Sequence, residues 1–193
     1  MSDGPQPGPD GRLRCSWSLG TPDYIAYHDT EWGRAVHGEQ ALYERISLEA
    51  FQSGLSWITI LRKRPAFRAA FADFDPERVA EFGQADVERL MADAGIVRNA
   101  RKVDATIANA RAVLDLRAQG GLDEIFWSFQ PPSRSRPAGM GEVPAQTDIS
   151  KALAKRLKQA GFKHVGPTTM YAAMQACGLV DDHLEGCWVG ESK

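Results

Sequence analysis

The sequence predicts an all-α fold for this 193-residue chain, and three observations support that prediction. Apolar residues recur at helical spacing along most of the chain. Capping residues and glycines stand where such segments begin and end. No segment shows sustained period-two alternation rich in β-branched residues, so we expect no sheet. With 43% hydrophobic and 25% charged residues, the composition is that of a soluble globular protein of one or two domains.

Three predicted helices are defined by apolar residues on one face. These residues are Leu42, Ile46 and Ala50 in the first, Val103, Ile107, Ala110 and Leu114 in the second, and Ile149, Leu153 and Leu157 in the third. A spacing of three or four residues turns such side chains toward a common core. The helices are therefore expected to pack through these faces.

Further signals mark where helices begin and end. Asp75 before Pro76 predicts a helix start, because aspartate caps the first turn and proline fits the first helical position. Asp148 is the expected cap of the helix that contains Ile149. Glycines are expected to end the remaining segments: Gly95 after a short helix over 85–94, Gly120 and Gly121 after the long helix, and Gly161 after the third.

The segments outside these helices are rich in proline and glycine. Residues 1–11 contain three Pro and three Gly, and we expect a disordered tail there rather than a secretory signal. Residues 130–144 contain four Pro and are expected to form a loop. No apolar run approaches the length of a membrane span, and three cysteines are too few for a secreted disulfide framework. We expect a cytoplasmic protein that does not associate with membranes.

The net charge of −2 conceals an uneven distribution. Residues 149–180 contain no Asp or Glu but five basic residues, whereas the remainder carries 18 basic and 25 acidic residues. A surface that faces phosphates would need such an acid-free segment. A solvated helix face is the alternative explanation.

Cysteine and histidine residues lie near both ends of the fold. Cys15 and His28 stand near its start, and His183 and Cys187 are four residues apart near its finish, which we expect to be one side of a helical turn. A Cys₂His₂ set is complete for tetrahedral Zn²⁺ and leaves no position for a catalytic water, so such a metal would be structural. Ordinary buried residues are the alternative. Cys177 lies among apolar residues and is expected in the core.

A cluster of aromatic residues occupies the first third of the chain. Its members are Trp17, Tyr24, Tyr27, Trp32 and Trp57. Such rings suit a flat ligand, particularly a nucleobase or a cation, although an aromatic core explains them as well. Glu49 follows Ile46 by three residues, so its carboxylate points toward an apolar face. A buried carboxylate needs a partner and often marks a site, with a salt bridge to an arginine as the simpler explanation.

The segment 161–166, GFKHVG, is bounded by two glycines and precedes a helix that we expect to start near Pro167 or Thr168. Glycines allow close backbone approach, and the N–H groups of a helix start face an anion. This arrangement is typical of a helix-hairpin-helix phosphate clamp, with a plain turn as the alternative. Pro167 fits a first helical position but supplies no N–H group.

Several short motifs, taken together and in order, resemble the DNA-3-methyladenine glycosylase I family. The motifs are RCSW (14–17), DYIAYHD (23–29), EWG (31–33), GLSWI (54–58), DAGI (93–96), FWSF (126–129), GFKHVG (161–166) and MQACGLV (174–180). The resemblance extends from about Arg14 to Cys187. It implies a helix-hairpin-helix glycosylase fold over 12–190, which we expect to comprise two helical subdomains with a base pocket between them.

The resemblance also implies roles for individual residues. Cys15, His28, His183 and Cys187 are expected to bind one structural Zn²⁺, and Glu49, Tyr27, Trp17, Tyr24 and Trp57 to line the base pocket. Expected DNA contacts are Gly54 and Leu55, which could fill the gap left by a flipped nucleotide, and Gly161, Lys163, Val165, Gly166 and Thr168 around the hairpin. The expected activity is hydrolytic removal of N3-alkylated purines, chiefly 3-methyladenine, from double-stranded DNA by a monomeric enzyme.

Two other functions remain open on the sequence. A zinc hydrolase would need an open metal position, and a non-catalytic zinc-stabilised DNA-binding module would keep the hairpin but have no use for Glu49. No general base is assigned. Asp181 and Asp182 lie about twenty residues after the hairpin, where most glycosylases of the superfamily carry a catalytic aspartate, although the resemblance implies that this family lacks that arrangement. Asp182 precedes His183, so a supporting or capping role is at least as consistent with its position.

Overall fold

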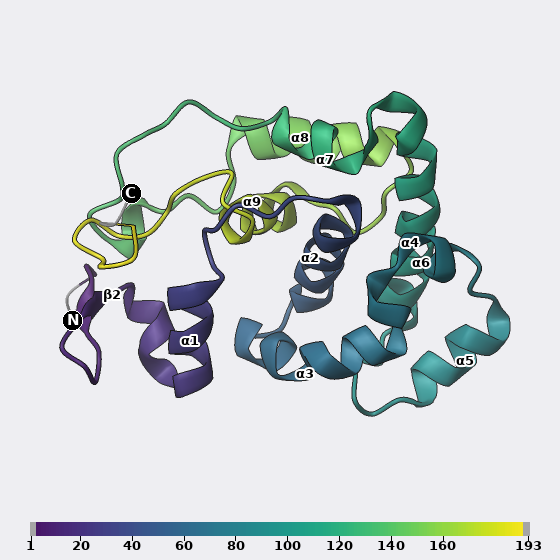
Figure 1. Ribbon diagram of the computed structural model, residues 1–193, viewed down its shortest axis with the longest axis horizontal. Coiled ribbons are helices and arrows are strands. Elements are labelled where there is room, and N and C mark those ends of the chain that lie inside the picture. Colours follow the sequence, from purple (N-terminus) through teal and green to yellow (C-terminus); the bar gives the residue numbers. More distant parts are fainter. Residues whose placement is uncertain (1–2, 191–193) are drawn as a thin grey trace.

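The computed structural model describes residues 3–190 and consists mainly of helices (Figure 1). The α-helices are α1 (Pro22–Thr30), α2 (Glu39–Gln52), α3 (Trp57–Ala70), α4 (Pro76–Ala80), α5 (Gln84–Ala92), α6 (Ala100–Leu116), α7 (Gly121–Trp127), α8 (Asp148–Gln159) and α9 (Pro167–Ala176). Short 3₁₀-helices are η1 (Ser16–Gly20), η2 (Ala72–Phe74), η3 (Arg117–Gln119) and η4 (Met140–Glu142), and two short strands are β1 (Gln6–Pro7) and β2 (Leu13–Arg14). The predicted all-α class is confirmed.

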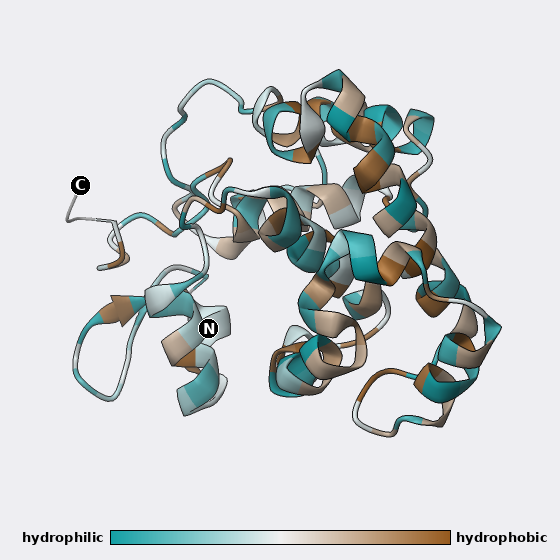
Figure 2. Ribbon diagram, turned by 45° about the vertical axis from the view of Figure 1, so that its right-hand side comes forward, coloured by the Kyte–Doolittle hydropathy of each residue, from teal (hydrophilic) through white to brown (hydrophobic). Residues whose placement is uncertain are grey.

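Helix α2 lies at the centre of the fold and packs against α3, α6, α7 and α9. Leu42 and Ile46 are fully buried and Ala50 nearly so, which confirms the face that the spacing predicted. Brown and teal segments alternate along the helices in Figure 2, as amphipathic helices require. No helix within residues 3–190 is long and apolar enough to cross a membrane.

The buried apolar residues form two clusters of unequal size. The large one contains the inner faces of α2 to α9, and includes Cys177 as predicted. The small one joins Cys15 from the start of the chain to Leu184, Cys187 and Val189 from its end, with Trp17 packed against them. The two ends of the chain accordingly lie close together in Figure 1. The division into two helical subdomains stays a prediction.

The prediction of a disordered tail is wrong for residues 3–11, whereas Met1 and Ser2 lie outside the described residues. Strands β1 and β2 pair antiparallel, so the expectation of no sheet is also wrong. Asp3 further ties this segment to η4, since its carboxylate accepts from the Gly141 N–H at 2.7 Å and its carbonyl from Met140. Strands of two residues are too short to show alternation, so only long-range hydrogen bonds reveal them.

Local capping explains where the helices begin and end. The Asp75 side chain accepts from the N–H groups of the first turn of α4, and Pro76 is its first residue, as predicted. The cap of α8 is Thr147 rather than Asp148, because the Thr147 hydroxyl accepts from Ser150 N at 3.1 Å. Helix α5 ends at Ala92 instead of residue 94, since the turn that follows is closed by a hydrogen bond from Gly95 N to the Asp93 side chain.

The reassigned cap of α8 gives a stability test. We expect Thr147→Ala to lower the free energy of unfolding by about 1 kcal/mol, because the first turn of the helix loses its acceptor. Asp148→Ala should cost less than about 0.5 kcal/mol, since the Asp148 side chain is exposed and caps nothing. Urea unfolding of both variants measures the difference. An equal loss, or a larger loss for Asp148→Ala, would restore Asp148 as the cap.

Candidate base-binding pocket and metal cluster

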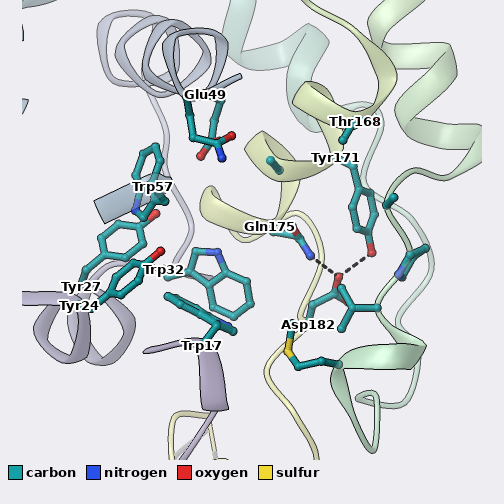
Figure 3. A pocket seen from close by; sticks show the side chains of 16 residues that line it. Trp17, Tyr24, Tyr27, Trp32, Glu49, Trp57, Thr168, Tyr171, Gln175 and Asp182 are labelled. Atoms are coloured by element: carbon teal, nitrogen blue, oxygen red, sulfur yellow. Dashed lines mark hydrogen bonds between the residues drawn. The ribbon is translucent and has the colours of Figure 1, made fainter. Parts of the chain in front are cut away.

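A cavity of about 420 Å³ opens between helices α1, α2, α3 and α9. It is lined by Trp17, Tyr24, Tyr27, Trp32, Glu49, Gln52, Trp57, Met140, Val143, Pro144, Ala145, Thr168, Tyr171, Ala172, Gln175 and Asp182 (Figure 3). All five residues predicted for a base pocket are among them. A volume of this size suits a small flat ligand, because ligand pockets commonly range from about 300 to 1,000 Å³.

Aromatic rings form one wall of the cavity. Trp17 meets Tyr24 and Trp32 edge to face, with ring centroids 5.3 and 5.0 Å apart. Tyr27 lies 5.4 Å from Trp57. Burial raises the pKa of Tyr27 well above its usual value, so its hydroxyl group keeps its proton and remains a donor. The wall therefore offers flat apolar faces with a few polar handles.

Glu49 lies at the end of the cavity formed by α2. The residue is 6% exposed, and no donor among residues 3–190 is hydrogen-bonded to its carboxyl group. Burial raises its pKa to about 8, and the Arg45 guanidinium, one helical turn earlier, only partly opposes that rise. The alternative explanation, a salt bridge from Glu49 to an arginine, does not hold within residues 3–190, because Arg45 pairs with Glu31 at 3.0 Å instead. Burial thus favours the protonated form of Glu49 far more than in an exposed glutamate.

The opposite wall is organised around Asp182. Its carboxylate accepts hydrogen bonds from the Tyr171 hydroxyl at 2.6 Å and the Gln175 amide at 2.8 Å, and it pairs with Arg134 (Figure 3). Asp182 is buried, and its partners fix its position. These contacts connect Asp182 to other residues of the pocket wall and not to His183. The expected supporting role of Asp182 beside His183 is therefore not what its contacts show.

Some of the lining residues that were not predicted for the pocket could have been found from helical spacing. Gln52 follows Glu49 by three residues on α2, and Tyr171 and Gln175 are one turn apart on α9. Helical spacing could have indicated that Gln52 lies on the same face of α2 as Glu49, and that Tyr171 and Gln175 share a face of α9. The cavity is also lined by Met140, Val143, Pro144 and Ala145. They belong to a loop whose sequence has no periodic pattern, so the local sequence does not predict that this loop lies at the cavity.

The four predicted metal ligands come together in one buried cluster. The ligand atoms of Cys15, His28, His183 and Cys187 all lie within 4.8 Å of one another. Cys187 Sγ is 3.5 Å from His28 Nε2 and 3.8 Å from His183 Nδ1, and Cys15 Sγ is 3.9 Å from the same Nδ1. Around a tetrahedral Zn²⁺, neighbouring S and N ligand atoms stand about 3.3 to 3.8 Å apart. The donor set and its spacing thus fit a four-coordinate ion.

Neighbouring groups orient these ligands. Asp29 accepts from His28 Nδ1 at 2.8 Å, and the buried Arg14 holds the Asp29 carboxylate at 2.8 Å. The Trp32 carbonyl lies 3.3 Å from His183 Nε2. The nitrogen that faces the cluster is therefore Nε2 in His28 and Nδ1 in His183. Metal-binding histidines are commonly held in this way, with the second ring nitrogen hydrogen-bonded to a carboxylate or a carbonyl.

His183 and Cys187 do not lie on a helical turn, contrary to prediction. Residues 181–184 are irregular. A turn follows in which Cys187 N donates to the Leu184 carbonyl at 2.9 Å, and this turn places Cys187 beside His183. Asp181, which pairs with Arg136 at 2.9 Å, also accepts from His183 N at 3.3 Å. His183 and Cys187 are thus brought together by an irregular loop, which contacts of the Asp181 side chain stabilise, and not by a helix.

The predicted hairpin connects α8 to α9 over residues 160–166. Gly161 adopts a φ of +98°, which favours glycine, and Val165 is buried beneath the turn. Lys163 N donates to the Asn109 side chain at 2.7 Å, so this N–H group is not free for phosphate. In the described chain, the N–H groups of Gly166 and Thr168 donate to no protein acceptor. They remain available to an anion at the start of α9.

The second predicted DNA-contacting segment follows α2. Gly54 and Leu55 lie in a tight turn between the pocket residues Gln52 and Trp57. Leu55 is 39% exposed, and Leu13 is the other large apolar side chain with comparable exposure among residues 3–190. The exposed side chain of Leu55 beside the cavity is available for contact with a partner.

The raised pKa of Glu49 predicts a pH-dependent stability. The protonated form is favoured by folding, so its stabilising contribution is present below about pH 4.5 and is lost as the pH rises to about 8. Glu49→Gln stays neutral, and we expect its stability relative to wild type to rise between about pH 5 and pH 8 by on the order of a few kcal/mol. Urea unfolding across this range measures the trend.

Glu44→Gln is the matched control for this experiment, since Glu44 lies on the same helix outside the cavity and pairs with Arg68 at 2.8 Å. The same pH dependence in both variants would contradict the assignment of the effect to the buried carboxyl group of Glu49.

Comparison with known proteins identifies the family of the chain. The family model described as methyladenine glycosylase matches residues 17–190. DNA-3-methyladenine glycosylase 1 of Escherichia coli (strain K12) is 49% identical over 177 residues, which cover 90% of this chain and 95% of the relative.

Solved structures agree as well. A crystal structure of 3-methyladenine DNA glycosylase I superposes with a TM-score of 0.88 at 48% identity, covering 91% of this chain and 98% of that one. A structure from Staphylococcus aureus, which describes 3-methyladenine recognition by 3-methyladenine DNA glycosylase I, has a TM-score of 0.87 at 35% identity and covers 91% and 95%. Given this agreement in sequence and fold, the chain belongs to the methyladenine glycosylase family.

Proposed function

We propose that this protein is a monofunctional DNA glycosylase that hydrolyses the bond between deoxyribose and an N3-alkylated purine, chiefly 3-methyladenine, and leaves an abasic site. The observation that carries the proposal is a buried carboxyl group, Glu49, at the end of an aromatic cavity large enough for one base. Relatives named for this activity support it. One chain supplies the whole pocket, so we propose a monomer that acts on double-stranded DNA in the cytoplasm of a bacterial-type cell.

Recognition of the base rests on charge and shape. A purine alkylated at N3 is cationic, and the faces of Trp17 and Trp57 can stack on such a ring. The Glu49 carboxyl group accepts from the amino edge of the base, and the Tyr27 hydroxyl contacts the ring. A cation beside Glu49 favours the ionised carboxylate, so the bound base lowers the pKa that burial has raised. An uncharged adenine supplies no such compensation and is bound less well.

The positive charge also makes the base a good leaving group. As the bond from C1′ to N9 breaks, the electron pair goes to the base, which departs as neutral 3-methyladenine. Water adds to the oxocarbenium-like C1′ and loses a proton to solvent. We assign no side-chain base: Asp182 is engaged by Tyr171, Gln175 and Arg134, and Asp181 by Arg136. The enzyme therefore acts mainly by extruding and holding the damaged nucleotide.

Two surfaces are proposed to hold the DNA. Leu55, presented by Gly54, enters the gap that the extruded nucleotide leaves. Gly161, Val165 and Gly166 shape the hairpin, and the free N–H groups of Gly166 and Thr168 face a phosphate. Lys163 adds a positive charge nearby through its exposed side chain.

We further propose that Cys15, His28, His183 and Cys187 bind one Zn²⁺ per chain. The ion would supply structural cross-linking between the two chain ends, since four protein ligands leave no open position. This arrangement does not favour the zinc hydrolase considered on sequence grounds.

The activity is tested by release of free base from methylated duplex DNA, separated by chromatography. We expect wild type to release 3-methyladenine and little 7-methylguanine. Glu49→Gln should reduce the rate about 10- to 100-fold, because the amide oxygen can still accept from the base but carries no negative charge to match the cationic ring. Glu44→Gln controls for the same substitution elsewhere on α2 and should retain the wild-type rate. If wild type binds zinc and retains DNA but frees no base, a non-catalytic DNA-binding module replaces the glycosylase.

The metal is tested by elemental analysis and thermal unfolding. We expect one zinc per chain in wild type, and in Cys187→Ser a loss of zinc and of several kcal/mol of stability, because ligand binding and folding are coupled. Cys177→Ser is the matched control, since Cys177 is also buried but lies outside the cluster. Equal zinc content in all three proteins would contradict the proposed ligand set.

A further inference from the structure

Lys102 is a buried lysine whose ammonium group is directed at the end of another helix. It lies in the first turn of α6 and is 9% exposed. Its Nζ donates to the carbonyl of Phe51 at 2.8 Å and to that of Ser53 at 2.7 Å. No carboxylate among residues 3–190 pairs with it. Burying a lysine costs free energy because its ammonium group loses water. In Lys102, hydrogen bonds to two backbone carbonyls at the end of α2 compensate for this loss.

These carbonyls belong to the turn that presents Leu55. The turn is closed by hydrogen bonds from Leu55 N to the Gln52 carbonyl at 2.7 Å and from the Gln52 amide to the Leu55 carbonyl at 2.9 Å. Gly54, with a φ of +83°, permits the reversal. Lys102 thus lies beneath a turn whose exposed side carries Leu55.

The physical role of the ammonium group follows from this position. The last carbonyls of a helix have no partner within the helix and carry partial negative charge. A cation that binds two of them fixes the direction in which the chain leaves α2. Without Lys102, the Phe51 and Ser53 carbonyls would lose these donors, and the turn could shift relative to Glu49, which lies two residues before Phe51.

We propose that Lys102 is a positioning residue that fixes the turn 52–55, so that Leu55 enters the DNA in register with the pocket. This inference rests on the proposed glycosylase function. Lys102 itself does not line the cavity and is not expected to touch the base. Its effect should therefore appear in steps that need the duplex, and not in binding of the free base.

The test is Lys102→Met, which keeps the apolar stem and removes the charge. We expect single-turnover release of 3-methyladenine from duplex DNA to fall about 10- to 100-fold, as displacement of a positioned group by about 1 Å can cause. Calorimetric binding of free 3-methyladenine should stay within about twofold of wild type. A loss of both, or of neither, would overturn the proposal.

Lys63→Met is the matched control. Lys63 Nζ also donates to two backbone carbonyls, those of Ala94 at 2.9 Å and Gly95 at 3.1 Å, but at a different turn. We expect it to release base at the wild-type rate. An equal loss in Lys63→Met and Lys102→Met would show a general effect on stability and would overturn the assignment to the turn 52–55.

A double-mutant cycle with Leu55→Ala locates the effect. If Lys102 acts through Leu55, Lys102→Met should cost less than about twofold in the Leu55→Ala background. Independent, additive losses would overturn the proposal. Should Lys102→Met fail to fold, Lys102→Gln, which keeps an N–H donor without the charge, replaces it in the cycle under the same criteria. If wild type itself releases no base, the glycosylase function has failed, and free-base binding by wild type distinguishes that result.

Discussion

The convergence of Cys15, His28, His183 and Cys187 is the constraint on which the pocket depends. It joins segments more than 150 residues apart in sequence, and the aromatic wall is built directly against it. The ring of Trp17 lies 5.4 Å from His28, and that of Trp32 lies 4.7 Å from His183. Trp17 and Trp32 therefore contact the cluster on one side and the cavity on the other. A metal in this cluster would stabilise the shape of the pocket without entering it.

The cavity contains two carboxyl groups in contrasting surroundings. Asp182 is buried but compensated by Arg134, Tyr171 and Gln175. Glu49 is buried and has no hydrogen-bond donor in the described chain, which is why its pKa rises to about 8. Hydrogen-bond donors and an arginine within the protein keep a buried carboxylate ionised and fix its position. The protonation of a buried carboxyl group without such partners depends on the charge of the group that binds beside it. This asymmetry makes Glu49 the group suited to distinguish a cationic from a neutral base.

Helix α2 connects the cavity to the exposed Leu55. It carries Glu49 near its end, leads directly into the turn with Leu55, and is surrounded by α3, α6, α7 and α9. Lys102 from α6 binds the carbonyls at its end. Hydrogen bonds within the turn and from Lys102 therefore connect the cavity to the exposed Leu55 over only a few residues of chain.

The sequence by itself determined several of the helices, the buried face of α2, the cap at Asp75 and the inward direction of Glu49. Through the family resemblance it also grouped Cys15, His28, His183 and Cys187 as candidate metal ligands. These features follow from spacing along one segment or from motifs that stand intact in the chain. The tertiary structure decided the rest. The ordered N-terminal hairpin, the pocket wall around Asp182, the placement of loop 140–145 and the contact of Lys102 with the end of α2 join distant segments, and local spacing carries no information on which distant groups meet. Burial without a donor, which sets the protonation of Glu49, likewise exists only once the surrounding helices have packed.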